Sequence, residues 1–154
     1  MDSIKKKDFV NSLKYLLKET FEGSPETGSV YLDKGVGVFN SIENLSVEDA
    51  SKSNGGANIA AHTEHLRYYI EVLGNFLEGN VQIADWSKSW AIQDVSEDEW
   101  TEIKTDLKSQ FEKITESFNQ KEDWSEDAMT EAIAIIVHSA YHLGAIRQII
   151  KGQK

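Results

Sequence analysis

The spacing of the apolar residues is the feature that most constrains the fold. Apolar side chains recur at steps of three and four through most of the 154 residues, and Pro25 is the only proline. This period is typical of helices that each present one apolar face. Four helices of this kind bury their faces around a common axis, so the pattern predicts an all-α four-helix bundle formed by one domain, residues 1–154. We expect the helices at about 3–22, 57–78, 97–119 and 126–152.

Residues that start and stop helices support these bounds. GSPETG at 23–28 is expected to end the first helix, because glycine and proline both resist continuing one. Ser96, with a glutamate three residues later, matches a capping box, and Ser125 is expected to cap the last helix. Ser46 followed by Asp49 predicts a further short helical turn.

The apolar faces of the second and third helices are the most regular. Each repeats every three or four residues over five turns or so, which predicts burial along the whole helix. The residues expected to be buried are Ile59, Leu66, Ile70, Leu73, Leu77, Trp100, Ile103, Leu107, Phe111, Ile114 and Phe118.

Two long connections separate the first three helices. Residues 29–56 have no clean period and are long for a connection without structure in a compact domain. Their length allows an up-up-down-down order, which short loops would forbid, so we expect that topology with a long first connection. The next connection contains Trp86 and Trp90, and we expect a loop packed by these aromatic side chains.

Composition excludes several classes of function. The chain has 16 Lys and Arg against 26 Asp and Glu, a net charge of -10 that disfavours a nucleic-acid partner. No uninterrupted apolar run reaches the roughly 18 residues of a membrane span, and no export signal is recognisable at the N-terminus, so we expect a cytoplasmic protein with no membrane partner. With no cysteine, any metal must be held by nitrogen and oxygen ligands.

All four histidines fall in two of the expected helices. His138 and His142 are four residues apart, which places both rings on one helix face, one turn apart and beside the apolar stripe. Imidazole is the commonest metal ligand among side chains, and one ion would satisfy both rings. A third ligand must come from 57–78, where helical geometry places His62 nearer the interior and His65 at the margin. A catalytic ion must be reachable by substrate, so the residues alone leave the third ligand open between His62 and His65.

The two histidine segments resemble the motifs of a known superfamily. NIAAHTEHL at 58–66 is similar to the second-helix motif of the DinB-like superfamily, which includes the YfiT-like metal-dependent hydrolases, with an aliphatic residue six positions before a ligand histidine. That aliphatic residue is Ile59, so the match falls on His65. HSAYHLGAIRQI at 138–149 resembles the family's closing HxxxH motif and matches His138 and His142.

The resemblance extends to the four-helix plan and implies a three-histidine site with positions open to water and substrate. It therefore favours His65, His138 and His142 as ligands of a divalent ion, zinc or nickel. It leaves His62 as a core polar residue, an orienting partner or an alternative ligand. The family also includes bacterial thiol S-transferases and thiol-dependent isomerases, and homodimers are common in it.

Two functional hypotheses follow. The first is a metal-dependent enzyme, a hydrolase or a thiol S-transferase, whose ion activates water or a low-molecular-weight thiol for reaction with a small-molecule substrate. The second is a non-catalytic helical module that binds a metal or a partner. The sequence identifies no catalytic residue. Glu64 is expected to be a solvated helix carboxylate rather than a base, and Tyr69 a packing residue one turn from His65.

Overall fold

This computed structural model describes residues 5–153, and helices are the only regular elements among them. The expectation of an all-α protein is therefore confirmed. The start expected for the first helix, near residue 3, lies outside the described residues. In chain order the elements are α1 (Lys6–Glu22), α2 (Val38–Ile42), α3 (Val47–Ser51), α4 (Ile59–Leu77), the 3-10 turn η1 (Lys88–Trp90), α5 (Glu97–Gln120) and α6 (Glu126–Gly152).

Side-chain caps fix the starts of three helices as expected. The Ser96 hydroxyl accepts from the backbone of Glu99, whose carboxylate in turn accepts from the Ser96 backbone, so the capping box at the start of α5 is confirmed. Ser125 caps α6 by accepting from the third residue of the helix, and Ser46 caps α3 in the same way. These contacts satisfy amide groups that a helix start otherwise leaves without partners.

Asn58 is a cap that sequence reasoning missed. Its Oδ1 accepts from the amide of Ala61 at 2.8 Å, and this caps α4. Its Nδ2 donates to the carbonyl of Ser51 at 2.9 Å and to that of Gln93. One buried amide thus joins the end of α3, the start of α4 and the connection that leads into α5.

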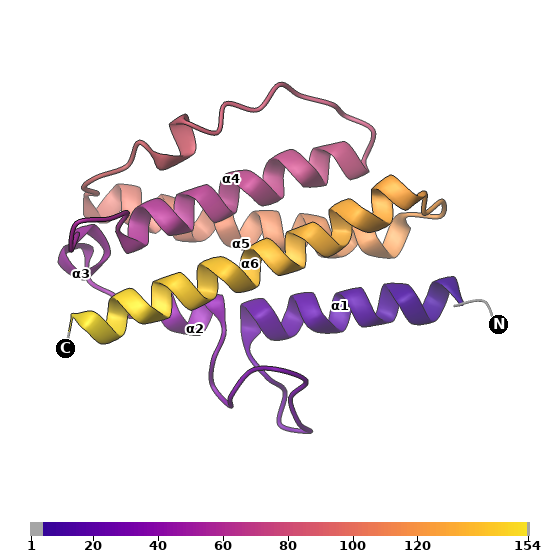
Figure 1. Ribbon diagram of the computed structural model, residues 1–154, viewed down its shortest axis with the longest axis horizontal. Helices are drawn as coiled ribbons and strands as arrows, with labels where there is room; N and C mark the ends of the chain where they lie inside the picture. Colours follow the sequence, from indigo (N-terminus) through magenta and orange to yellow (C-terminus); the bar gives the residue numbers. More distant parts are fainter. Residues whose placement is uncertain (1–4, 154) are drawn as a thin grey trace.

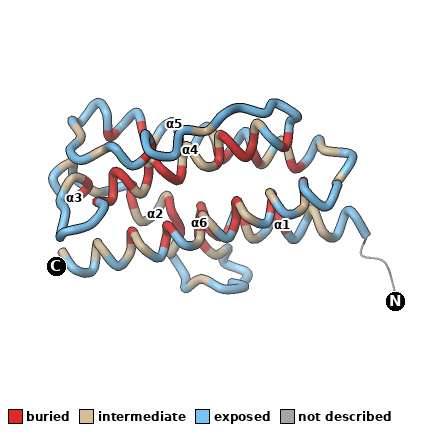
Figure 2. Tube along the Cα trace, turned by 45° about the horizontal axis from the view of Figure 1, so that its top comes forward, coloured by how far each residue is buried: buried red, intermediate tan, exposed pale blue. Residues whose placement is uncertain are grey.

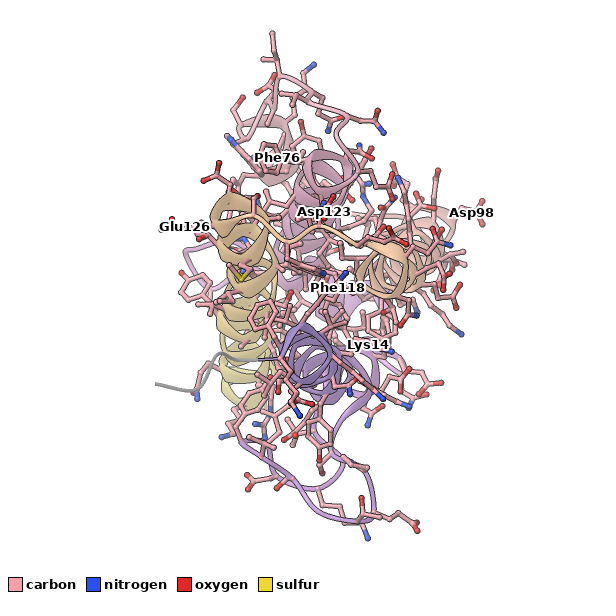
Figure 3. All side chains as sticks on the ribbon, turned by 90° about the vertical axis from the view of Figure 1, so that its right-hand side faces the viewer. Lys14, Phe76, Asp98, Phe118, Asp123 and Glu126 are labelled. Carbon is pink, nitrogen blue, oxygen red and sulfur yellow. The ribbon has the colours of Figure 1, made fainter. Side chains whose placement is uncertain are left out.

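The four long helices lie lengthwise beside one another, and their apolar faces meet between them (Figure 1). Every residue expected to be buried in α4 and α5 is buried. Buried positions lie on the inner sides of the four long helices (Figure 2). In the view along the helices, Phe118 points between them whereas Asp98 points outward (Figure 3). The predicted periodicity therefore identifies the core correctly.

The helix directions differ from the expected up-up-down-down order. The start of α4 is bonded near the start of α5 through Asn58 and Gln93, and Lys121 at the end of α5 donates to the carbonyl of Leu77 at the end of α4. These two helices are therefore parallel. Lys6 at the start of α1 donates to the carbonyl of Glu122, just beyond the end of α5, so α1 runs antiparallel to them, and α6 runs back in the direction of α1 (Figure 1).

The physical reason is that the connection expected to cross the length of the bundle was the first one, whereas the second one does so. Residues 23–58 fold partly into α2 and α3, which pack at one end of the molecule against α1 and α6 and against α4 and α5. Residues 78–96 instead run back along the outside of α4, from its end to its beginning (Figure 1). The crossover is therefore the second connection, and it places Trp86 and Trp90 over α4.

Helix α6 is apolar on more than its buried side. By length and composition alone it could cross a membrane, although the core helix of a water-soluble protein passes the same test. Here it packs against α1 and α4. Ile133, Val137 and Tyr141 occupy its exposed side and add to its apolar composition. The absence of a membrane partner stays a prediction.

A buried carboxylate holds part of the first connection. Glu19 is 1% exposed and accepts from the amides of Val30 (2.9 Å), Tyr31 (2.9 Å) and Leu32 (2.8 Å). Burial alone would raise the pKa of Glu19, but the three amides favour the charged form and leave the pKa below its ordinary value of 4.5.

Replacing Glu19 with Gln is expected to lower the free energy of unfolding at pH 7 by about 1–3 kcal/mol, because the three backbone amides lose their bonds to a charged acceptor. A carboxyl with a lowered pKa stabilises the fold fully above the ordinary value of 4.5, and this contribution is lost as the pH falls through the lowered pKa. Urea unfolding of both proteins should therefore show a difference that shrinks in acid. The control is Glu22→Gln, which removes only an exposed pair with Lys18, and a difference no larger than that of the control would contradict the role of Glu19.

Candidate metal centre

The structure brings together the three histidines that the sequence predicts as ligands. His65 lies on α4, and His138 and His142 lie on the facing side of α6. One ring nitrogen from each lies within 4.8 Å of the others, and among the described residues this is the group able to hold a metal ion. The packing of α4 against α6 thus converts two separate sequence motifs into one set of nitrogen donors.

The geometry within the set is close to what a small ion needs. His138 Nε2 and His142 Nε2 are 3.0 Å apart. Nitrogens that share a tetrahedral ion at about 2.0–2.1 Å are separated by roughly 3.3 Å. The α6 pair therefore already has nearly the required spacing, and one ring nitrogen of His65 lies within 4.8 Å of both.

His62 lies beside this group but not in it. Its Nδ1 is 2.9 Å from Nδ1 of His142, on the side of that ring opposite the nitrogen that faces His138. His62 thus contacts the α6 pair through His142, which is the position of a residue that would orient a ligand rather than bind the ion itself. Of the roles left open for His62 by the sequence, this contact favours the orienting one.

The order of burial on α4 is the reverse of what helical geometry predicted. His65 is 6% exposed, whereas His62 is only half-buried. The reason is the segment 78–96, which covers the side of α4 that carries His65. Trp90 stacks on the His65 ring with centroids 4.1 Å apart and planes inclined by 21°. A helical wheel cannot register cover that comes from a crossover connection.

Ser89 is a second contact of His65 that the sequence did not reveal. The Ser89 hydroxyl lies 2.7 Å from His65 Nδ1 and donates to the carbonyl of Trp86 at 2.8 Å. Ser89 is buried within η1. Sequence reasoning singled out the two tryptophans around it as loop-packing residues, and they were the available signal that this segment packs on α4.

Aromatic rings surround the remaining faces of the site. Tyr69 stacks on His138 with centroids 3.6 Å apart, which confirms its packing role. Tyr141 meets His142 edge-on at 5.1 Å and is largely exposed. The histidines therefore lie in a mostly apolar environment with one tyrosine at the protein surface.

This environment keeps the imidazoles neutral. Burial, with help from the neighbouring rings, lowers the pKa of His142 to about 3 and that of His138 to about 4. Burial also lowers the pKa values of His62 and His65. A metal ligand must be deprotonated, so at neutral pH the rings have lone pairs available without competition from protons.

The Glu64 carboxylate is paired with a cation and is not free to act as a base. It forms a two-pronged ion pair with Arg67, which also bonds Glu71. Both members of the Glu64–Arg67 pair are largely buried, so the expectation of a freely solvated carboxylate is wrong. The physical reason is that Arg67 lies three residues on, on the same face of α4.

Comparisons with protein-family models, with curated proteins and with solved structures give no match for this chain. The resemblance to the DinB-like superfamily therefore stays a prediction based on two motifs.

Replacement of any of His65, His138 and His142 by Ala is expected to weaken binding of a divalent ion by more than about 100-fold, because each supplies one of three ligands. His62→Ala should keep the same stoichiometry, since its contact is with a ligand. Elemental analysis of protein purified without a nickel column, followed by competition titration, measures both. Gln148→Ala, on the exposed side of α6, is the matched control. Unchanged affinity in His65→Ala and His138→Ala would exclude the site.

Proposed function

We propose that this chain is a metal-dependent enzyme of the DinB/YfiT-like type, a four-helix bundle whose His65, His138 and His142 bind zinc or nickel. The observation that carries the proposal is the convergence of three neutral imidazoles from α4 and α6 on one point. Catalytic zinc sites use three protein ligands and keep one position open, whereas structural sites use four. His62, the remaining histidine, is engaged with His142 rather than with this point.

The chemistry follows from the donor set. A divalent ion held by three neutral imidazoles acts as a Lewis acid and lowers the pKa of the water or thiol at its open position. His65, His138 and His142 supply no charge of their own, so the positive charge of the site is not reduced by the protein. The aromatic rings around them exclude water and provide a surface for the apolar part of a small substrate.

Thiol transfer is the better supported of the two reactions. Hydrolysis commonly needs a nearby carboxylate as base. Glu64 is close enough to His65 to affect its pKa electrostatically, but it forms an ion pair with Arg67. A thiol has an ordinary pKa of about 8.5, so it needs a much smaller pKa shift than water to reach its reactive form at neutral pH. We therefore propose a low-molecular-weight thiol as the cosubstrate and hydrolysis as the alternative reaction.

A transfer assay tests this proposal. Protein loaded with zinc or nickel is expected to accelerate the conjugation of a low-molecular-weight thiol to an electrophilic aromatic substrate, and a chelator should lower the rate at least about 100-fold. His138→Ala should show the chelated rate whether or not metal is added, whereas Gln148→Ala should keep the full rate. Ester and lactone panels measured in parallel detect hydrolysis. A rate that survives chelation would contradict a metal-dependent enzyme.

The cover over the site supports a second candidate, a non-catalytic module with a structural ion. His142 is fully buried and Trp90 is stacked on His65, so an ion held there would be shielded from solvent. In this case the ion would stabilise the packing of α4 on α6 and no exchangeable ligand would be required.

The open position itself distinguishes the two candidates. In the cobalt(II)-substituted protein, an added thiol should shift and intensify the visible absorption bands if a position is free for it. A structural site should leave the spectrum unchanged at any thiol concentration while still raising the melting temperature. An unchanged spectrum combined with metal-dependent stability would favour the non-catalytic module.

A further inference from the structure

The hydrogen bonds around Ser89 have a fixed direction. A carbonyl can only accept, so the Ser89 hydroxyl, 2.8 Å from the carbonyl of Trp86, donates its single proton there. The same oxygen is 2.7 Å from Nδ1 of His65 and has no second proton to give. It therefore accepts, and Nδ1 of His65 must be the protonated ring nitrogen.

The direction of these bonds leaves Nε2 of His65 without a proton. A neutral imidazole has one N–H and one lone pair, and the bond made by one nitrogen determines the state of the other. Since Ser89 occupies Nδ1, Nε2 is the atom available to an ion. The facing atoms of His138 and His142 are also Nε2. Nε2 is thus the candidate ligand atom on all three rings.

The turn that carries Ser89 is packed against α4. Ser89 itself is 3% exposed. The amide of Asp85 donates to the Tyr68 hydroxyl at 2.9 Å, which ties the start of the turn to the helix. Trp90, the next residue after Ser89, stacks on the ring that Ser89 contacts. The serine oxygen is therefore placed before any ligand arrives.

We infer that Ser89 is a positioning residue that fixes the Nδ1–H tautomer and the ring orientation of His65, so that its Nε2 is presented with those of His138 and His142. This inference rests on the proposed metal site for its purpose, but the tautomer is a property of the protein alone. Metal-ligating histidines commonly donate their second N–H to an oxygen in this way. Here the oxygen belongs to the crossover connection, so residues 78–96 become part of the site.

The pairing of His142 with His62 lacks this property. Either Nδ1 can be the donor in a contact between two imidazoles, so the 2.9 Å separation does not determine a tautomer. Ser89 differs because a backbone carbonyl determines the direction of its bonds. Removing the Ser89 hydroxyl therefore has a predictable effect on which nitrogen of His65 carries the proton.

Nitrogen-15 NMR of the imidazole rings at neutral pH tests the inference in metal-free protein. In the natural sequence, His65 is expected to carry its proton on Nδ1. In Ser89→Ala the proton should move in whole or in part to Nε2, and Ser89→Thr, which keeps the hydroxyl, should restore Nδ1–H. The control is Ser87→Ala, which removes an exposed hydroxyl of the same turn bonded to Asp85 and should leave His65 unchanged.

Zinc competition titration gives the second readout. Ser89→Ala should weaken zinc binding by about 10–100-fold, while Ser89→Thr and Ser87→Ala should stay near the natural affinity. A His65 proton on Nε2 in the natural sequence, or undiminished zinc affinity in Ser89→Ala, would overturn the inference. If the natural protein binds no zinc or nickel, the proposed function fails, and the tautomers of the natural, Ser89→Ala and Ser89→Thr proteins still decide the role of Ser89. If Ser89→Ala does not fold, the natural and Ser89→Thr proteins remain for the NMR test, and a His65 proton on Nε2 in either would overturn the inference.

Discussion

The structure depends on how four imidazoles are accommodated where α4 packs on α6. Each ring carries two polar nitrogens, and burying them without partners would cost more than the packing of the rings returns. Both nitrogens of His142 and one nitrogen each of His62, His138 and His65 are bonded to another ring or to Ser89, and among the described residues no buried polar side-chain atom lacks a partner. The packing of α4 on α6 also places one nitrogen of His65 within 4.8 Å of the α6 pair, so the bonded rings and the candidate metal centre share one place in the fold.

Much of this arrangement is encoded locally and could be predicted from the sequence. Every position of α4 and α5 that the three-and-four spacing predicts to be buried is buried, because the apolar face of a helix depends only on its own residues. Caps at Ser96 and Ser125 are equally local, since donor and acceptor are three residues apart. The pairing of His138 with His142 follows from one turn of helix. His65 required the motif resemblance, because helical geometry alone favoured His62.

What the sequence did not reveal involves contacts between distant segments. The parallel direction of α4 and α5 is set by the path of residues 78–96. The length of a connection does not predict the path that it takes. Asn58 reaches a carbonyl 35 residues away and Ser89 reaches a ring 24 residues away, and neither has a local pattern that marks it. The burial of His65 also depends on a distant segment, because a tryptophan of the crossover connection covers the ring.

The two outer contacts of the histidine group together constrain its protons. An ion held by the α6 pair requires both facing Nε2 atoms to be unprotonated, so the proton of His142 must then lie on Nδ1. Nδ1 faces His62, which must accept through its own Nδ1 and keep its proton on Nε2. Ser89 sets one ring in advance, whereas His62 adjusts to what His142 requires. The group thus combines a fixed ring on α4 with an adaptable pair on α6, and the low pKa values of His138 and His142 keep that pair neutral.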